Sequence, residues 1–511
     1  MESGGAWYGP ASPERLGCAA GGGGAAATPG GGPGALSCFR VGQGPATDSP
    51  ATAPDPRERL GPHPRASAGS GGAPMTHAAR PSRYPLYVLF LLTLLNLLDY
   101  VDRYIIASVG SLIRRDFVIS DARFGLFGTL FFLVYLITAP VFGYLGDRFP
   151  RRAVLALGAI VWSLATAGAS LAPTYLFLLL SRGLVGIGEA SFGTLSPPFL
   201  ADYFPVRQRA RVMAVFYVTL PAGAALAYLL AGKLGETHGW RFCFMLVGLP
   251  GLLLAVPIFF LREPVRGGME GRETDPAPGL MPGGDEDFSY RKRISHVVAS
   301  YRELIRSRSY LYTNLGYAAL TFAIGGMAFW MPRYLETIKG VSFEESNRLT
   351  GSIVALCGFF GTLAGGFAGD LVMRWTRRAY LLLSGLGVLA AIPFALGAIF
   401  SPERRVYAPC LGAAIFFLFV NTGLLNAVIV SVSPPRLRST AVAANIVIIH
   451  ILGDAPSPYL IGQVSDLSSL QGGILLAVAA MLVSGLLLLW GSRWLPGDLE
   501  RVAGKSLGSR G

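Results

Sequence analysis

Long apolar stretches separated by short polar connections dominate the chain from about residue 84 onward. Each stretch is close to the roughly 20 residues that an α-helix needs to cross a bilayer. No stretch remains that would form a soluble catalytic domain, so the expected fold class is an all-α membrane protein. The pattern predicts twelve transmembrane helices, near 84–112, 122–145, 152–171, 173–196, 211–233, 241–261, 310–334, 348–372, 378–400, 406–431, 438–463 and 472–495.

The first 74 residues differ from the rest in being rich in glycine, alanine and proline. Such a segment cannot bury a core, so we expect residues 1–83 to form a disordered N-terminal tail. The segment lacks the apolar region of a signal peptide, and a transit peptide is the weaker alternative. Met75 opens a short polar segment directly before the first span, and we hypothesise that translation begins there.

The charge pattern predicts how the spans are oriented. The chain has 511 residues, of which 52% are hydrophobic and 14% charged, and its formal net charge is +13. The basic residues gather in every second loop, with Arg114 and Arg115 as an exception. By the positive-inside rule these loops and both termini lie in the cytoplasm, and the cell (inner) membrane is the expected location. Because membrane orientation explains the excess of basic residues, we expect no nucleic-acid partner.

The sequence predicts neither an enzyme nor a metal or cofactor site. It has no nucleotide-binding phosphate loop and no hydrolase motif such as G-x-S-x-G or H-E-x-x-H. A signalling receptor is excluded because the DRY sequence lies in the first of twelve spans rather than at the end of a third span of seven. The cysteines have neither disulfide nor metal-ligand spacing; they are Cys18, Cys38, Cys243, Cys357 and Cys410.

Two motifs in the first half of the chain recur in the second half. GYLGDRFPRR at 143–152 is echoed by GFAGDLVMRWTRR at 366–378, and FPVRQRARVMA is echoed by PPRLRSTAVA. These repeats predict two pseudo-symmetric six-helix halves, 84–262 and 310–495, joined by a basic cytoplasmic linker at 263–309 and followed by a cytoplasmic tail at 496–511. Internal duplication on this scale is typical of transporters.

The repeated G-x-x-G-D motif predicts a gate between the halves. Glycines let two helices approach closely, and Asp147 can accept hydrogen bonds from a helix N-terminus of the other half. Such a contact is made in one conformation and broken in the other. The motif resembles the conserved loop motif of the major facilitator superfamily. The candidate gating residues are Gly143, Gly146, Asp147, Arg148, Arg152, Gly369 and Asp370.

Charged residues inside two apolar spans are the candidates for the transport chemistry. In LNLLDYVDRYIIA (95–107), Asp99, Asp102 and Arg103 are spaced to share one helix face, roughly 22 to 29 Å along the span. Arg182 and Glu189 lie two turns apart in the fourth span. The facilitator architecture implies that spans 1 and 4 line one central site, so Asp102, Arg103, Arg182 and Glu189 are expected around it.

These residues suggest how a proton is exchanged for a substrate. A carboxylate paired with arginine stays ionised, and when the arginine turns to a substrate anion, the carboxylate binds a proton more readily. We therefore assign proton coupling to Asp102, Glu189 and Asp99, and substrate binding to Arg103 and Arg182. The alternative is a structural ion-pair network without a role in transport.

The eleventh span contains the sequence HILGDAPSPYLIGQVSD, which predicts an irregular helix. Gly453 and the prolines should break or kink the helix and free carbonyl groups near Asp454. His450 is either a satisfied core residue or a functional one. Tyr104, His450 and Asp454 complete the candidate substrate-binding residues.

The chain is identified as a member of the spinster family of the major facilitator superfamily by its span 1 sequence, SRGLVGIGEAS, GYLGDRF and LGDAPSPYLIGQVSD. The resemblance covers about 84–495. It implies a twelve-helix alternating-access carrier of lysolipids or sphingoid phosphates, coupled to protons through Asp102 beside Arg103 and requiring Arg182 and Glu189. The chain departs from the family at Asp99, where the family usually has asparagine.

The function expected from the sequence is therefore a proton-coupled secondary transporter of a lysolipid, a sphingoid phosphate or a similar amphipathic anion. A facilitator of small organic anions or drugs, and a non-transporting sensor, are the alternatives. The expected partners are the substrate, protons and the bilayer, and we expect a monomer.

Overall fold

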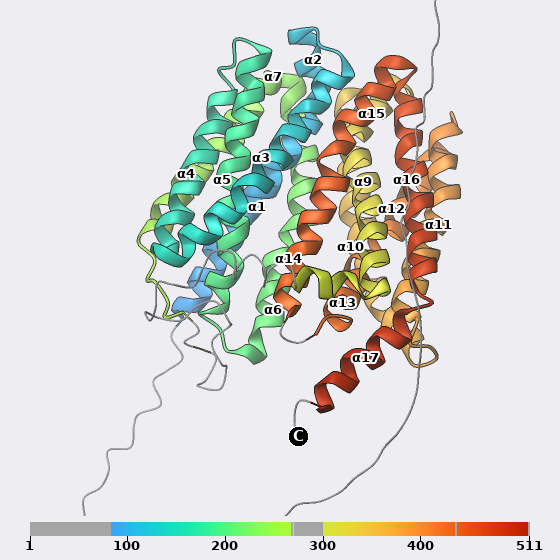
Figure 1. Ribbon diagram of the computed structural model, residues 1–511. Coiled ribbons are helices and arrows are strands. Elements are labelled where there is room, and N and C mark those ends of the chain that lie inside the picture. The colour runs from blue at the N-terminus through green and yellow to red at the C-terminus, as the bar shows by residue number, and fades with distance from the viewer. Residues whose placement is uncertain (1–82, 267–268, 270–299, 435–436, 509–511) are drawn as a thin grey trace, which may run out of the picture. The chain divides into compact units, whose positions relative to one another are not determined.

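The computed structural model describes residues 83–266, 269, 300–434 and 437–508 (Figure 1). The N-terminal tail with Cys18, Cys38 and Met75, and most of the linker, lie outside the described residues. The described residues belong to one compact unit. The helices are α1 (Tyr84–Ser108), α2 (Gly110–Phe117), α3 (Asp121–Arg148), α4 (Arg151–Ala169), α5 (Tyr175–Ala201), α6 (Val206–Tyr217), α7 (Thr219–Phe259), α9 (Arg308–Thr337), α10 (Phe343–Met373), α11 (Ala379–Phe400), α12 (Arg404–Phe419), α13 (Asn421–Ser431), α14 (Arg438–Ile449), the π-helix η3 (His450–Asp454), α15 (Pro456–Leu467), α16 (Leu470–Gly491) and α17 (Leu495–Gly508).

Within the described ranges, eleven helical segments are long and apolar enough to cross a membrane. One of them, Arg207–Phe259, has 53 residues, far more than a single crossing needs. It is interrupted at Gly239, whose φ of 81° lies in the left-handed region that glycine tolerates. The segment therefore supplies two of the twelve predicted spans, 207–238 and 240–259, and the all-α membrane fold is confirmed.

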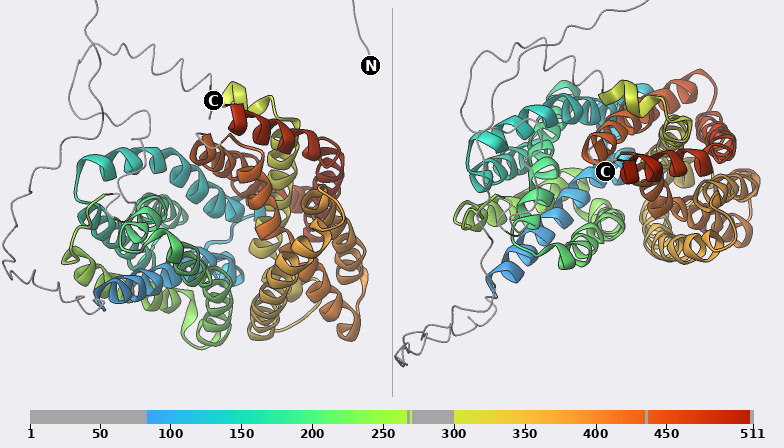
Figure 2. Two further views of the ribbon diagram at one scale, coloured as in Figure 1. Left: turned by 90° about the horizontal axis from the view of Figure 1, so that it is seen from below. Right: turned by 60° about the horizontal axis from the view of Figure 1, so that its bottom comes forward.

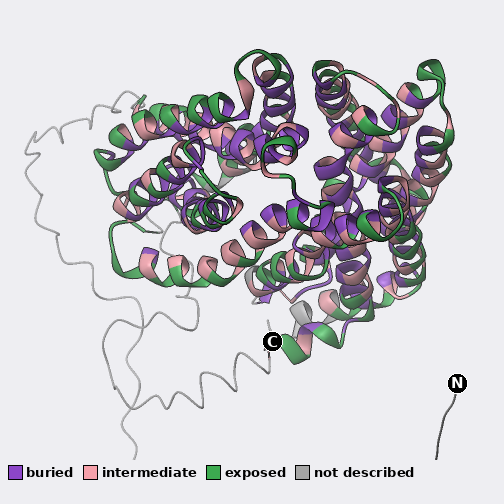
Figure 3. Ribbon diagram, turned by 90° about the horizontal axis from the view of Figure 1, so that it is seen from above, coloured by how far each residue is buried: buried purple, intermediate pink, exposed green. Residues whose placement is uncertain are grey.

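The helices pack as two groups that follow the predicted halves. In the first group α7 packs on α1 and α4, and α5 packs on α3 and α4; in the second, α16 packs on α9 and α11, and α12 packs on α10 and α11. Figure 2 shows the two groups side by side, blue to green and yellow to red. They meet where α3 packs on α15, α7 on α10 and α1 on α9. Buried residues concentrate on the faces that helices turn toward one another (Figure 3).

The repeated loop motif packs in the same way in both halves. A Cβ added at Gly146 would lie 2.2 Å from Leu195, and one added at Gly369 would lie 2.4 Å from Leu424. The second glycine of each motif is therefore required by close packing on a neighbouring helix. The expectation that Gly143 serves the same purpose is wrong, because a Cβ there would meet nothing closer than 3.9 Å.

The helix bundle has two opposite ends, the α2 face and the α17 face. The α2 face is the end where α2 lies, α3 begins and α15 ends, and the α17 face is the opposite end, where α3 ends and α17 lies (Figure 1). At the α17 face, Glu263 caps the start of α4 by accepting hydrogen bonds from the backbone N–H groups of Arg151 (2.9 Å) and Arg152 (3.1 Å).

Candidate functional site

The centre of the first half contains an arginine shared by two carboxylates. Arg103 of α1 donates from Nη2 to Glu189 of α5 at 2.8 Å and to Asp99, one turn earlier on α1, at 3.2 Å. The side chain of Arg103 is 19% exposed, whereas those of Glu189 and Asp99 are 0% and 5% exposed. The arginine is therefore the most exposed member of this network.

An aromatic box surrounds the Arg103 guanidinium. The rings of Tyr100, Phe131 and Tyr135 have their centroids 5.1, 5.3 and 5.6 Å from its Cζ. Aromatic faces attract a cation, so the box holds the positive charge without neutralising it. These three residues were missed from the sequence because their common target lies on α1, while two of them come from α3.

Asp102 and Arg182 form a separate, more deeply buried pair. Arg182 Nη2 lies 2.9 Å from Asp102 Oδ1, and the two side chains are 2% and 1% exposed. Thr166 of α4 donates a short hydrogen bond to the other oxygen of Asp102. Among the four charged residues expected around one site, the structure thus forms two pairs, Arg103 with Glu189 and Arg182 with Asp102. Neighbouring positions on a helix point about 100° apart, so Asp102 and Arg103 reach different residues of α5, Arg182 and Glu189.

The irregular helix predicted near Asp454 is present as the π-helix η3. His450 Nδ1 lies 2.8 Å from Asp454 Oδ2. The carbonyl groups around this irregularity accept hydrogen bonds from other helices: Thr129 donates to Ala455 (2.6 Å) and Trp330 donates to Pro458 (3.1 Å). The prediction that carbonyl groups are freed here is confirmed, and α3 and α9 supply their partners.

The His450–Asp454 pair of the second half faces the aromatic box of the first. The His450 ring stacks on Phe132 of α3, with centroids 5.6 Å apart, and meets the edge of Tyr135 at 6.1 Å. Tyr135 therefore contacts both Arg103 and His450. It joins the charged centres of the two halves.

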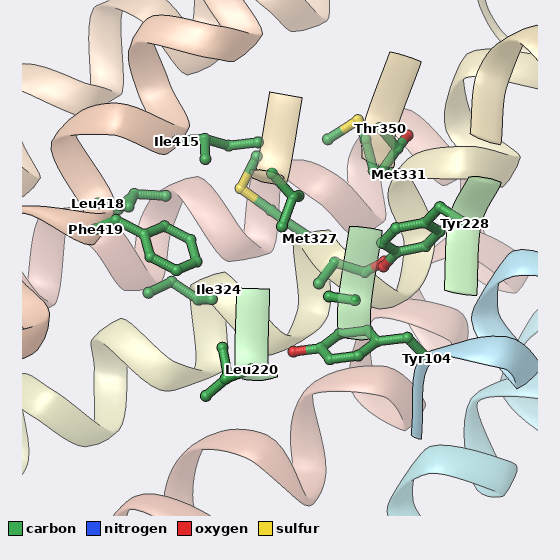
Figure 4. Close-up of a pocket in the computed structure, with 13 residues that line it drawn as sticks. Tyr104, Leu220, Tyr228, Ile324, Met327, Met331, Thr350, Ile415, Leu418 and Phe419 are labelled. Carbon is green, nitrogen blue, oxygen red and sulfur yellow. The ribbon is translucent and has the colours of Figure 1, made fainter. Parts of the chain in front are cut away.

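An apolar pocket lies between the halves beside this site. Tyr104, the residue after Arg103, lines it. Figure 4 shows Tyr104 and Tyr228 on one side of the pocket and Leu418 and Phe419 on the other, with Met327 between them. Its lining contains no charged residue, so it suits a hydrocarbon group.

The predicted gate residues at the α17 face are not engaged across the halves. Within the described part of the chain, the exposed Asp147 carboxylate has no hydrogen bond or ion pair, and Arg148 lies over Tyr144 of its own helix at 4.6 Å. Arg152 donates to the Leu261 carbonyl (2.6 Å), and Asp370 accepts from Tyr380 (3.3 Å). Among the residues that the structure describes, the contact that the motif predicts is thus not made.

A carboxylate at the α2 face ties α2 to α7. Asp116 accepts hydrogen bonds from Trp240 (2.8 Å) and Arg241 (2.5 Å). Partial burial favours a higher pKa of Asp116, but the two hydrogen bonds and the charge of Arg241 outweigh it and lower the pKa below the usual aspartate value. Across the described ranges, no three histidine, cysteine or acidic side chains gather as a metal site.

Comparisons with known proteins agree with this architecture. Residues 92–458 match the model of the Major Facilitator Superfamily. Protein spinster homolog 1 of Bos taurus is 37% identical over 387 residues, which cover 72% of this chain and 70% of the relative. The sphingosine-1-phosphate transporter SPNS2 of Xenopus tropicalis is 33% identical over 419 residues, which cover 78% of each.

Solved structures show the same fold. A bacterial homolog of the human lysosomal transporter spinster, solved in an inward-facing and unoccupied conformation, superposes with a TM-score of 0.71 at 24% identity, covering 82% of this chain and 99% of that one. A D-xylose–proton symporter superposes with a TM-score of 0.65 at 15% identity, covering 79% and 97%. The superfamily consists of transporters rather than enzymes. The chain belongs to the spinster family of the major facilitator superfamily.

Proposed function

We propose that this chain is a proton-coupled, alternating-access carrier of an amphipathic anion, such as a lysolipid or a sphingoid phosphate. The observation that carries the proposal is that Arg103 and Tyr104 are adjacent residues of α1. Arg103 is a partly exposed cation in an aromatic box, and Tyr104 lines the uncharged pocket between the halves. The pair therefore offers an anion-binding group directly beside space for a hydrocarbon chain. One relative is named as a sphingosine-1-phosphate transporter, which fits this chemistry.

The two carboxylates that share Arg103 provide the coupling. When a phosphate draws the guanidinium away, Glu189 and Asp99 lose the cation that offsets their burial. A buried carboxylate without a partner is costly, and taking up a proton removes the cost. Oε1 of Glu189 and Oδ1 of Asp99 are buried without a hydrogen-bond partner among the described residues, so each offers an oxygen for that proton.

The second buried pair links this event to the conformational change. Asp102 follows Asp99 on α1 and is held by Arg182 of α5 and Thr166 of α4. A movement of α1 against α4 and α5 weakens these contacts and opens Asp102 to protonation. We propose Asp102 as the coupling residue of the opposite conformation, with Arg182 as its switch. His450 and Asp454 are the polar groups that the second half contributes to binding the same substrate.

Uptake by purified protein in liposomes tests the function. Labelled lysophospholipid, sphingosine phosphate and a small organic anion are compared with and without an inward-acid pH gradient. The proposal expects uptake of the lipids, stimulated by the gradient and lost in Arg103→Gln. Uptake of the small anion alone would contradict the lipid substrate. Absence of both uptake and counterflow would contradict the carrier function and favour the sensor.

A further inference from the structure

A network of charged residues joins the two halves at the α2 face, opposite the predicted gate. Asp466, at the end of α15, accepts hydrogen bonds from the backbone N–H groups of Asp121 and Ala122, both at 2.8 Å. These N–H groups belong to the first turn of α3, where no carbonyl of the helix can pair with them. A carboxylate of the second half thus caps a helix of the first half.

The side chain of Asp121 adds a second layer to this contact. It is 6% exposed, and its Oδ1 lies 3.1 Å from Arg333 of α9. Ser465, the neighbour of Asp466, donates to its Oδ2 at 2.5 Å. Arg114 of α2 pairs with the same carboxylate. One aspartate therefore binds an arginine and a serine of the other half.

Close packing of the backbones brings these groups into range. A Cβ added at Gly125 would lie 2.3 Å from the Pro458 carbonyl oxygen, and one added at Gly462 would lie 2.5 Å from the Asp121 carbonyl oxygen. No side chain fits between α3 and α15 at these points, so the two helices touch directly. The helices α3 and α15, labelled in Figure 1, pack against each other.

At the α17 face, the end of α3 and the start of α14 could form a matching contact, but it is not made among the described residues. Asp147 closes α3 at the α17 face and has no partner among the described residues. The segment that continues into α15 starts with α14, whose N-cap residue Leu437 provides no side-chain cap. Each of the two antiparallel segments therefore ends in an aspartate and begins with N–H groups that the other's aspartate is suited to cap.

We propose that Asp466, with Asp121 and Arg333, forms a latch that holds the α2 face closed and that alternates with Asp147 at the α17 face. Asp466 caps α3 at one end of this helix interface, Asp147 is placed to cap α14 at the other end, and the halves rock about the interface. When the α2-face latch forms, the α17 face is free to open. When it breaks, water replaces the Asp466 bonds to α3 while Asp147 reaches α14.

Distance measurements between spin labels test the latch without reference to a substrate. In protein with the native cysteines replaced, one pair of labels at Leu171 and Leu467 reports the α2 face, and another at Phe149 and Trp375 reports the α17 face; all four side chains are exposed. Asp466→Asn should raise the ratio of α2-face-open to α2-face-closed molecules roughly five-fold, the size expected for losing one helix cap. The α17-face distance should shorten in the same sample.

Matched variants separate the latch from a general effect of charge removal. Asp116→Asn removes a carboxylate from the same face, but its partners Trp240 and Arg241 belong to the same half, so both distances should stay at the wild-type values. Arg333→Gln, which weakens the latch at another point, should open the α2 face as Asp466→Asn does. If Asp466→Asn does not fold, the distances measured in Arg333→Gln decide the test. Unchanged distances in the folded latch variants, or equal opening in Asp116→Asn, would overturn the proposal.

Discussion

Arg103 lies 2.8 Å from Glu189, yet the arginine is 19% exposed and the carboxylate is fully buried. In the proposed mechanism, a substrate entering the site therefore meets the cation first and reaches the carboxylate only through it. The carboxylate can therefore sense an anionic substrate without touching it. Proton coupling in the proposed mechanism depends on this pairing of an exposed arginine with a buried carboxylate.

Glu189→Gln should uncouple transport from protons while preserving substrate binding. The amide keeps the size of the side chain and an oxygen for Arg103, but it takes up no proton. We expect lipid exchange at near wild-type rates and loss of stimulation by the pH gradient, both measured in liposomes. Asp99→Asn, which removes the other carboxylate beside Arg103, is the comparison. Gradient stimulation retained in the variant would contradict the role of Glu189.

Asp102→Asn should abolish proton-driven uptake and leave exchange less affected. It should also destabilise the protein, because Arg182 is 2% exposed and loses its only carboxylate partner among the described residues. Removing one member of a buried pair typically costs about 3–5 kcal/mol. Thermal unfolding in detergent measures the loss as a lowered Tm.

A double variant separates the two effects of Asp102. Asp102→Leu combined with Arg182→Met removes both charges, so the Tm should recover toward the wild-type value while coupling stays absent. A double variant as unstable as Asp102→Asn would show that the cost does not come from an unpaired arginine. Equal loss of driven uptake and exchange in a stable Asp102 variant would contradict its coupling role.

Val354→Phe should discriminate substrates by chain length. Val354 lines the pocket beside Tyr104, and the larger ring fills part of that pocket. We expect uptake of long-chain lysolipids to fall about ten-fold, while short-chain analogues lose less, because a ring that displaces about two methylene groups costs about 0.8 kcal/mol for each of them. Val354→Ala is the matched control and should favour longer chains. Equal inhibition at all chain lengths would place the hydrocarbon tail elsewhere.

The Asp116 contact should resist mild acid. Its pKa is below the usual aspartate value, so the stability it contributes is complete above the unfolded-state pKa and is lost only as pH falls through the lower folded-state value. Asp116→Asn should therefore lower the Tm by the same amount at pH 7 and pH 5. A penalty present at pH 7 and absent at pH 5 would show that Asp116 protonates well above the expected range.

The arrangement of spans could be predicted because length and apolarity decide it locally. The same holds for the pairing of Asp99 with Arg103, which are one helical turn apart. The aromatic box and the bond from Thr166 to Asp102 could not be predicted, since they depend on how α3 and α4 are rotated against α1. Spacing alone grouped Asp102 with Arg103, but the neighbouring helices supply a different partner for each.

The cap that Asp466 places on α3 could not be predicted from the sequence either. The aspartate stands in the quoted LIGQVSD segment, but its partners lie more than 300 positions earlier. Only the packing of α15 on α3 brings them together. By contrast, the irregular helix near Asp454 followed from Gly453 and the prolines, because those residues act on their own backbone.

Proton uptake on substrate binding tests the central claim most directly. Purified protein in weakly buffered detergent solution, with a pH indicator, is titrated with sphingosine phosphate under conditions where the phosphate's own protonation is measured separately. The account predicts that the wild-type protein takes up protons as Arg103 turns to the phosphate, and that Glu189→Gln binds the lipid but takes up markedly less. Binding without proton uptake in the wild-type protein, or unchanged uptake in Glu189→Gln, would contradict it.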